Sequence, residues 1–338
     1  MSTLTSSYYS SSEKDLVRSE FERPLLEAIH QRRGRPLRYF GLPGEEALDL
    51  KAWGHLLDYV AAVEVFPNVL KALEQRLDTH YSHIRYRTHL GDADTVILRN
   101  RSRRQEKGGQ GSWRWVSTTH REGDGWIWDF DVVYLDYFGK FLPYDRGGRQ
   151  VRNRALALRR LFDPDRQDAW QPWLLMVTVE SKLFGPQDKT QMRDYLGNAR
   201  GRAPDPVADA LDFLLESGLS RRFEAARLVH GTMAYIVSIA ASNADVKVRP
   251  RGTIMYRGAG QTPMLHFAYE IESAGTLSGH QDPLPLLVAP FVQVRSPAGW
   301  PWFELVAEQQ PGQTEAEVRA ALDFLGADQV EAMVAGLN

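Results

Sequence analysis

The chain has 338 residues, of which 43% are hydrophobic and 25% charged, and its formal net charge is −2. This composition is typical of a folded globular protein with a sizeable core, and it excludes a chain that is basic throughout. The absence of cysteine excludes disulfides, thiolate zinc sites and cysteine nucleophiles. No apolar run approaches the roughly 20 residues that a membrane span needs, so we expect a cytoplasmic protein.

The first 90 residues alternate between predicted helices and strands. Ser12 and Asp15 resemble a capping box, and the apolar residues after them recur at helical spacing. We therefore expect a helix over 13–31, kinked at Pro24, within a helical extension over 1–35. The elements expected next are a strand over 37–41, a helix over 45–58, a strand over 59–64, a helix over 67–79 and a strand over 84–88. This alternation predicts a parallel sheet with helices on its faces.

A basic segment over residues 99–125 interrupts the alternation. It contains the run NRSRRQEKGGQGSWRW, which predicts a long loop or an inserted arm. Basic residues interleaved with Trp113 and Trp115 suit a nucleic-acid backbone and its bases. The alternative is a solvated insertion that binds nothing.

The next strand ends in an acid. The apolar run from Phe130 to Leu135 is followed by Asp136-Tyr137-Phe138-Gly139, which predicts a strand buried on both faces. Ligands of open α/β sheets bind just outside the carboxyl ends of the strands, so Asp136 is a candidate site residue. The elements expected after it are helix 153–162, strand 173–180, helices 205–217 and 222–242, an antiparallel pair of strands over 247–256 and 264–272, and a helix to about 325 that begins with the capping box of Thr314 and Glu317.

This order of elements, over roughly residues 36–273, resembles that of the class I S-adenosylmethionine-dependent methyltransferases. The resemblance implies a Rossmann-like α/β fold. Its seven-stranded, mostly parallel sheet would have a terminal antiparallel strand pair and helices on both faces, with helical N- and C-terminal extensions, the latter over 274–338.

The resemblance also implies where the cofactor, S-adenosylmethionine, binds. Three turns after the first three strands, YFGLPGE, AVE and LGDAD, are similar to turns that contact this cofactor in the family. The residues implied are Phe40, Gly41, Gly44 and Glu45 for the methionine end, Glu64 for the ribose, and Asp92 and Ala93 for the adenine.

The motif LDYFG resembles the LDPFG of guanine-amino tRNA methyltransferases and of three-Cys-motif partner proteins, with Tyr137 in place of proline. The resemblance implies that Asp136 accepts a hydrogen bond from the acceptor amine and that Tyr137 or Phe138 stacks on a base. The expected reaction is methyl transfer to an amino group of a nucleic-acid base or nucleotide. A protein partner is also considered, and no membrane contact is expected.

Two alternatives stay open. Glu180 and Lys182 follow a buried strand, with Asp165 upstream, and resemble the PD-(D/E)xK nucleases, in which the two acids would hold Mg²⁺ and the lysine would orient water. The other is a non-catalytic Rossmann-like subunit of a nucleic-acid or defence complex, which the basic segment and the incomplete glycine turn favour. The histidines do not cluster at metal-ligand spacing, so the methyltransferase hypothesis includes no metal.

Overall fold

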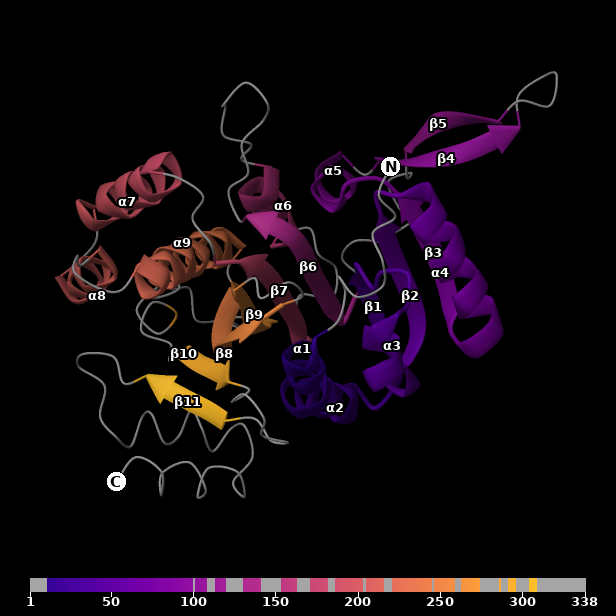
Figure 1. Cartoon of the computed structure of the whole chain (residues 1–338), viewed down its shortest axis with the longest axis horizontal. Coiled ribbons are helices and arrows are strands. Elements are labelled where there is room, and N and C mark those ends of the chain that lie inside the picture. Colours follow the sequence, from indigo (N-terminus) through magenta and orange to yellow (C-terminus); the bar gives the residue numbers. More distant parts are fainter. Residues whose placement is uncertain are drawn as a thin grey trace.

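The computed structural model describes residues 11–99, 101–107, 113–119, 130–140, 153–162, 171–181, 186–202, 205–215, 221–244, 246–258, 263–273, 286, 291–295 and 304–308. The described strands form one sheet of order β11-β10-β8-β9-β7-β6-β1-β2-β3-β4-β5 (Figure 1). The strands are β1 (Leu37–Gly41), β2 (Leu57–Glu64), β3 (Arg85–Leu90), β4 (Arg101–Lys107), β5 (Trp113–Thr119), β6 (Val132–Lys140), β7 (Trp173–Glu180), β8 (Val246–Arg257), β9 (Pro263–Ser273), β10 (Phe291–Arg295) and β11 (Glu304–Glu308).

Seven of these strands, in the order β3-β2-β1-β6-β7-β9-β8, form the centre of the sheet. Strands β3, β2, β1, β6 and β7 pair in parallel, and β9 is antiparallel to both β7 and β8. The chain therefore has the predicted Rossmann-like, mostly parallel sheet with a terminal antiparallel pair. Its direction of growth reverses between β1 and β6, and such switch points are where α/β sheets bind ligands.

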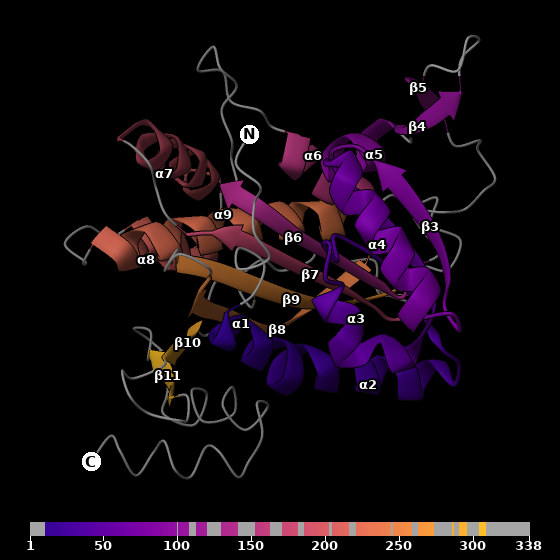
Figure 2. The same cartoon turned by 45° about the vertical axis from the view of Figure 1, so that its right-hand side comes forward.

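Helices cover both faces of the sheet, each over its own apolar cluster (Figure 2). One face packs against α2, α3 and α4, and the other against α5 to α9. The helices are α1 (Ser12–Leu16), α2 (Arg23–Arg33), α3 (Leu48–Trp53), α4 (Pro67–His80), α5 (Ala93–Arg99), α6 (Asn153–Leu161), α7 (Pro186–Arg200), α8 (Asp205–Leu215) and α9 (Arg221–Ala244), with a π-helical segment η2 (Val17–Glu22) and a 3₁₀ turn η3 (Gly54–Leu56). The helix predicted over 45–58 is thus shorter, because β2 begins at Leu57.

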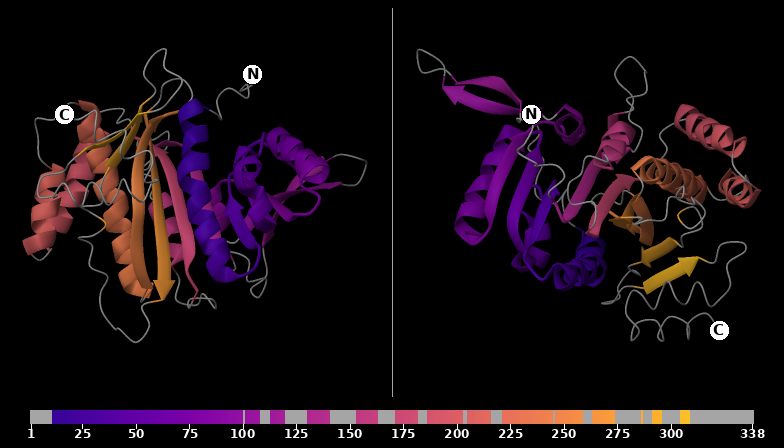
Figure 3. Two further views of the ribbon diagram at one scale, coloured as in Figure 1. Left: turned by 90° about the horizontal axis from the view of Figure 1, so that it is seen from below. Right: turned by 180° about the vertical axis from the view of Figure 1, so that it is seen from behind.

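The N-terminal helix predicted over 13–31 consists of three segments, α1, η2 and α2. Its cap is Ser11, whose Oγ accepts a hydrogen bond of 3.1 Å from the backbone N–H of Lys14. Pro24 lies in the first turn of α2, where a missing N–H costs little, and the irregular segment precedes it. Leu26 and Ile29 are fully buried, so the segment lies along the strands as part of the core (Figure 3, left).

Four further strands extend the sheet at its two edges. Within the basic segment, the described residues form an inserted arm, the second of the two predicted forms, and not a loop: β4 and β5 make an antiparallel hairpin that pairs with β3 through Leu90 and Arg103. The hairpin projects from the edge of the sheet (Figures 1 and 2). At the other edge, β10 and β11 occupy part of the expected C-terminal helical extension, while the helix predicted after Thr314 lies outside the described residues.

No described helix is long and apolar enough to cross a membrane.

Candidate cofactor and acceptor site

Three acids that the sequence singled out lie at one edge of the sheet. Glu64 is the last residue of β2, Asp92 follows β3 in the first turn toward α5, and Asp136 lies near the carboxyl end of β6. Because β6, β1, β2 and β3 are parallel neighbours, their carboxyl ends meet at this edge. The structure therefore brings together the ends of the strands that carry all four predicted motifs.

Glu64 ties the ends of β2 and β3 together. Its carboxylate Oε1 accepts a hydrogen bond of 2.9 Å from the backbone N–H of Phe66, and its carbonyl accepts one of 2.9 Å from Gly91. The residue is 8% exposed, and this burial raises the pKa of its carboxyl. The backbone N–H groups of Phe66 and Val65 act in the opposite direction and favour the ionised carboxylate, the form that accepts hydrogen bonds from hydroxyls.

The two residues after Glu64 are apolar and unusually exposed. Val65 is 52% and Phe66 45% exposed, whereas the large apolar side chains of the neighbouring strands are buried. Exposed apolar groups beside a hydrogen-bonding acid suit a flat, partly apolar ligand such as a purine ring. Sequence reasoning did not select these two residues, although the run Glu-Val-Phe-Pro at the end of a buried strand was the available signal.

Asp92 and Ala93 lie at the start of α5. Asp92 is exposed and its Oδ1 accepts a hydrogen bond of 3.1 Å from the backbone N–H of Thr95, which is the role of a helix cap. Ala93 is 3% exposed and packs into the core. Asp92 is thus reachable by a ligand, whereas the Ala93 side chain is largely covered.

The glycine turn after β1 is shaped by its neighbours. A Cβ at Gly41 would lie 2.1 Å from the Tyr39 hydroxyl, so the space that glycine leaves here is filled by Tyr39. Gly44 has a φ of 67°, which favours glycine, and Glu45 is half-buried. Phe40 is fully buried in the core, so its predicted role in the cofactor turn would involve its backbone.

The motif LDYFG divides between the two faces of the sheet, because successive residues of a strand alternate. Asp136 faces α1, where its Oδ2 forms an ion pair with the Lys14 ammonium. Tyr137 is 5% exposed and its hydroxyl donates a 2.5 Å hydrogen bond to Asp94 Oδ1, with the Arg154 guanidinium 4.3 Å above its ring. Tyr137 is thus engaged on the face opposite Asp136, the stacking role given to Tyr137 or Phe138 stays a prediction, and the side chain of Phe138 lies outside the described part of the structure.

Asp94 is a buried acid next to the predicted cofactor turn, and the sequence analysis gave it no role. Burial raises the pKa of its carboxyl to about 6, although the hydrogen bond from Tyr137 favours the ionised form. Its Oδ2 lies 3.8 Å from Arg154 Nε. The turn after β3 and the end of β6 are thus linked through one side-chain contact.

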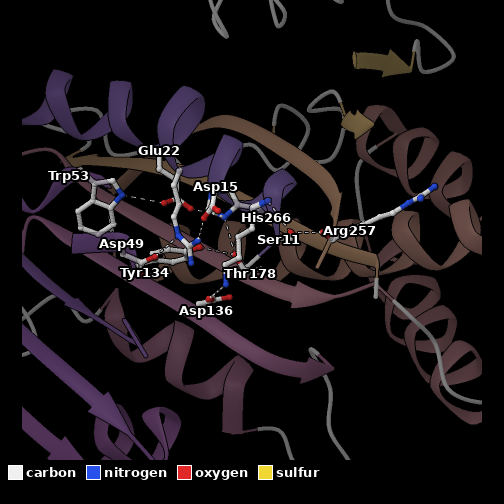
Figure 4. Close-up of polar contacts among 12 residues, drawn as sticks. Ser11, Asp15, Glu22, Asp49, Trp53, Tyr134, Asp136, Thr178, Arg257 and His266 are labelled. Carbon is white, nitrogen blue, oxygen red and sulfur yellow. Dashed lines mark hydrogen bonds and ion pairs between the residues drawn. The ribbon is translucent and has the colours of Figure 1, made fainter. Parts of the chain in front are cut away.

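Close to Asp136, a charged network joins η2 to the sheet (Figure 4). Arg18 Nε donates a 2.8 Å hydrogen bond to Asp49 Oδ1, its Nη1 lies 2.7 Å from Asp15, and the Tyr39 hydroxyl donates to Asp49 at 3.3 Å. The Arg18 and Asp49 side chains are 5% and 2% exposed. Lys14 and Arg18 are four residues apart on the predicted helix, so they lie on the same face of it. This spacing was the available sequence signal that charged side chains share the buried face.

The same network continues into the core through Glu22. Its Oε2 accepts a 3.4 Å hydrogen bond from Trp53 Nε1, and its Oε1 lies 3.7 Å from Nδ1 of His266, which is 2.9 Å from Thr178 Oγ1. Burial raises the pKa of Glu22 to about 8 and lowers the pKa of His266 to about 3. Burial thus favours the neutral form of both side chains, which is how ionisable groups are tolerated in a core.

For the nuclease alternative, only Glu180 at the end of β7 is described, since Asp165 and Lys182 lie outside the described residues. Among the residues that the structure describes, no group of three or more His, Asp or Glu is arranged to hold a metal ion. The nuclease alternative therefore gains no support from the described geometry.

The central seven strands, with one reversed strand and acids at the carboxyl edge, have the Rossmann-like fold of the class I methyltransferases. No protein-family model matches the sequence, and a search of curated proteins found no relative. Among solved structures the chain resembles Trm1 from Pyrococcus horikoshii, solved with S-adenosyl-L-methionine, at 9% identity over 99% of this chain and 78% of that one, with a TM-score of 0.39.

Two further solved structures resemble the chain. One is the magnesium protoporphyrin IX methyltransferase of Synechocystis, solved with bound SAH, at 8% identity over 77% of this chain and 86% of that one, with a TM-score of 0.35. The other is an S-adenosylmethionine-dependent methyltransferase from Agrobacterium tumefaciens, at 13% identity over 75% and 61%, with a TM-score of 0.37. At these identities and TM-scores, the similarities add no argument to that of the strand order.

Proposed function

We propose that this chain is an S-adenosylmethionine-dependent methyltransferase that acts on an amino group. The observation that carries the proposal is the position of Glu64, Asp92 and Asp136 at the carboxyl ends of neighbouring parallel strands, next to the switch point of the sheet. In such a site, Glu64 after β2 and Asp92 after β3 are available to a nucleoside. Asp136 of β6 is available to the group that receives the methyl group.

The described residues fit the adenosine half of the cofactor well. Glu64 offers a carboxylate oxygen to ribose hydroxyls, the exposed Val65 and Phe66 offer apolar surface to the adenine ring, and Asp92 is an exposed acceptor for its amino group. The methionine half would meet the turn around Gly44 and Glu45, since Tyr39 fills the space beside Gly41. The adenosine subsite is thus the better supported part of the cofactor site.

The bound cofactor would supply an activated methyl group on a sulfonium. Asp136 would accept a hydrogen bond from the acceptor amine, aim its lone pair at the methyl carbon and take up the proton that the nitrogen loses. In this conformation the Lys14 ammonium occupies Asp136 Oδ2, so an acceptor that binds this oxygen must first displace it.

As in the sequence analysis, a nucleic-acid base or nucleotide is the proposed acceptor, and the register of the β4–β5 hairpin supports this. Directly opposed residues of an antiparallel pair share a face, and alternate residues belong to opposite faces. The pairs Arg101–Thr119, Arg103–Ser117, Gln105–Trp115 and Lys107–Trp113 therefore lie on one face, which carries three basic residues, two tryptophans and no acid. This composition suits a phosphate backbone and stacked bases.

Transfer of a labelled methyl group from S-adenosylmethionine to fractionated RNA, DNA and protein tests this proposal. We expect label in the nucleic-acid fraction, and a loss of about 100-fold or more with Asp136→Asn, which is typical when a positioned proton acceptor is removed. Cofactor binding without label in any fraction would instead favour the second candidate, a non-catalytic nucleic-acid-binding subunit, which the hairpin face also supports.

A further inference from the structure

We propose that the Asp136 carboxylate is a subsite for an alkylammonium group and that Lys14 occupies it as an internal ligand. Lys14 lies 122 residues before Asp136 in the chain, and the two side chains are 11% and 15% exposed. The pair is therefore shielded, yet it lies at the carboxyl edge of the sheet. A shielded carboxylate selects a partner that carries positive charge, because an uncompensated charge is costly away from water.

The segment that carries Lys14 is held mainly by polar contacts. Ser11 Oγ donates a 2.8 Å hydrogen bond to the Arg257 carbonyl at the end of β8, and the Glu13 carboxylate accepts one from the Arg257 N–H. Leu16 is half-buried, and continuous apolar anchoring begins only at Val17, which is 2% exposed. The segment 11–16 can thus leave the sheet without opening the core, whereas residues 17–33 cannot.

A change of helix type lies where this segment meets the anchored part. The helix is α-helical to Leu16, π-helical from Val17 to Glu22, and α-helical again from Arg23. Irregular helical turns of this kind are often found at functional sites and are local weak points of the hydrogen-bond ladder. The segment 11–16 has the properties of a latch, with few buried apolar contacts and a defined point of separation.

The surroundings of Asp136 explain why an ammonium is favoured there. Burial raises the pKa values of Tyr134 and Tyr256, and the Asp136 charge raises them further, so Asp136 acts on aromatic hydroxyls as well as on Lys14. Among the residues that the structure describes, Arg18 is another cation close to Asp136, and it is engaged by Asp49 and Asp15. Lys14 is thus the cation that neutralises Asp136 in this conformation.

The regulatory meaning of this latch rests on the proposed methyl transfer, because Lys14 must leave Asp136 Oδ2 before the amino group of an acceptor, which is neutral when it accepts the methyl group, can bond to this oxygen. The subsite itself does not depend on that reaction. An enzyme in which Lys14 is removed would bind amine acceptors more tightly, since a tethered competitor at high effective concentration is lost.

The experiment is a chemical rescue of the full-length Lys14→Ala variant, measured as thermal unfolding with added n-butylammonium. We expect a Tm below that of the native chain and a recovery that grows with the logarithm of amine concentration, as for any ligand of the folded state. n-Butanol, which carries no charge, should not restore the Tm. Two control variants should not respond to n-butylammonium: Lys51→Ala, which removes an exposed lysine, and the double variant Lys14→Ala with Asp136→Asn. An equal response of Lys51→Ala would overturn the proposal.

If Lys14→Ala does not fold, the native chain provides the second measurement. Amine acylation followed by mass spectrometry should show Lys14 protected relative to Lys51. Because n-butylamine also consumes the reagent, the measured quantity is the ratio of Lys14 to Lys51 acylation, which n-butylammonium should increase. Unchanged reactivity would contradict the subsite. Amine rescue without S-adenosylmethionine binding would reject the methyltransferase function and leave the subsite standing. S-adenosylmethionine binding without amine rescue would reject the subsite and leave the methyltransferase function standing.

Discussion

The Tyr137 hydroxyl donates a 2.5 Å hydrogen bond to Asp94, and this bond joins the end of β6 to the first turn of α5. The two elements carry the turns that we assign to the acceptor and to the adenine of the cofactor. Tyr137, which the sequence placed in the acceptor pocket as a stacking group, is thus a structural link on the opposite face from Asp136.

We expect Asp94→Asn to change how stability depends on pH. The pKa of Asp94 is raised from 3.8 to about 6, so the folded chain retains a proton that the unfolded chain releases, and stability is lost as the pH rises from about 4 through 6. Urea unfolding across this range should show a flatter profile for Asp94→Asn. Asp209→Asn, at an exposed position of α8, should keep the native profile, and an unchanged slope in Asp94→Asn would show that Asp94 ionises normally.

Glu22 predicts a second pH effect, in the alkaline range. Its pKa is raised from 4.5 to about 8 by burial, so the stability that its neutral form contributes is fully present below pH 4.5 and is lost as the pH rises through 8. Glu22→Gln keeps the shape and removes the charge, and it should unfold at higher urea concentration than the native chain at pH 9. The exposed Glu20→Gln is the control. A native chain that outlasts Glu22→Gln at pH 9 would reject this account.

Arg18→Met should be one of the most destabilising single substitutions near the site. It leaves the Asp49 carboxylate buried without its guanidinium, a situation that costs roughly 3–5 kcal/mol in other proteins. Arg18→Met combined with Asp49→Leu should cost less than Arg18→Met alone, which denaturant unfolding of the three variants measures. A loss below about 1 kcal/mol in the single variant would mean that water replaces the lost partner.

Much of the fold follows from local sequence, because buried strands are continuous apolar runs. The runs LRYFG, YVAAVE, VVYL and WLLMVTVE gave strands β1, β2, β6 and β7, and their alternation with helices gave the parallel sheet. Strand β4 has the sequence RSRRQEK, which offers neither an apolar run nor an alternating pattern, so the segment was predicted as a long loop or an inserted arm without strands. An edge strand that projects from the sheet needs no buried face, and hydrophobic periodicity cannot detect it.

The site was predictable only where a residue sits at the end of a strand. Glu64, Asp92 and Asp136 were found in this way, but their partners were not. Lys14 meets Asp136 across 122 residues, and the helix that carries it gives no local sign of which acid it will face. The alternation of a strand correctly separates Asp136 from Tyr137, but it does not reveal which helix covers each face.

The hairpin predicts a face-specific loss of nucleic-acid binding. Arg101→Glu with Arg103→Glu changes the face that carries Trp113 and Trp115, whereas Arg104→Glu with Arg114→Glu makes the same charge change on the other face. We expect the first pair to weaken binding of a labelled single-stranded RNA by roughly tenfold or more in fluorescence anisotropy, and to lower the salt dependence. Equal losses for the two pairs would mean that net charge, not the face, determines binding.

Isothermal titration calorimetry with S-adenosylmethionine and its demethylated product tests the central claim most directly. We expect both to bind the native chain and Glu64→Ala to weaken each by roughly 10–100-fold, which corresponds to the loss of charge-assisted hydrogen bonds to the ribose. Asp58→Asn, near the amino end of the same strand, should bind as the native chain does. No binding of either ligand to the folded native chain, or equal binding by Glu64→Ala, would contradict the account.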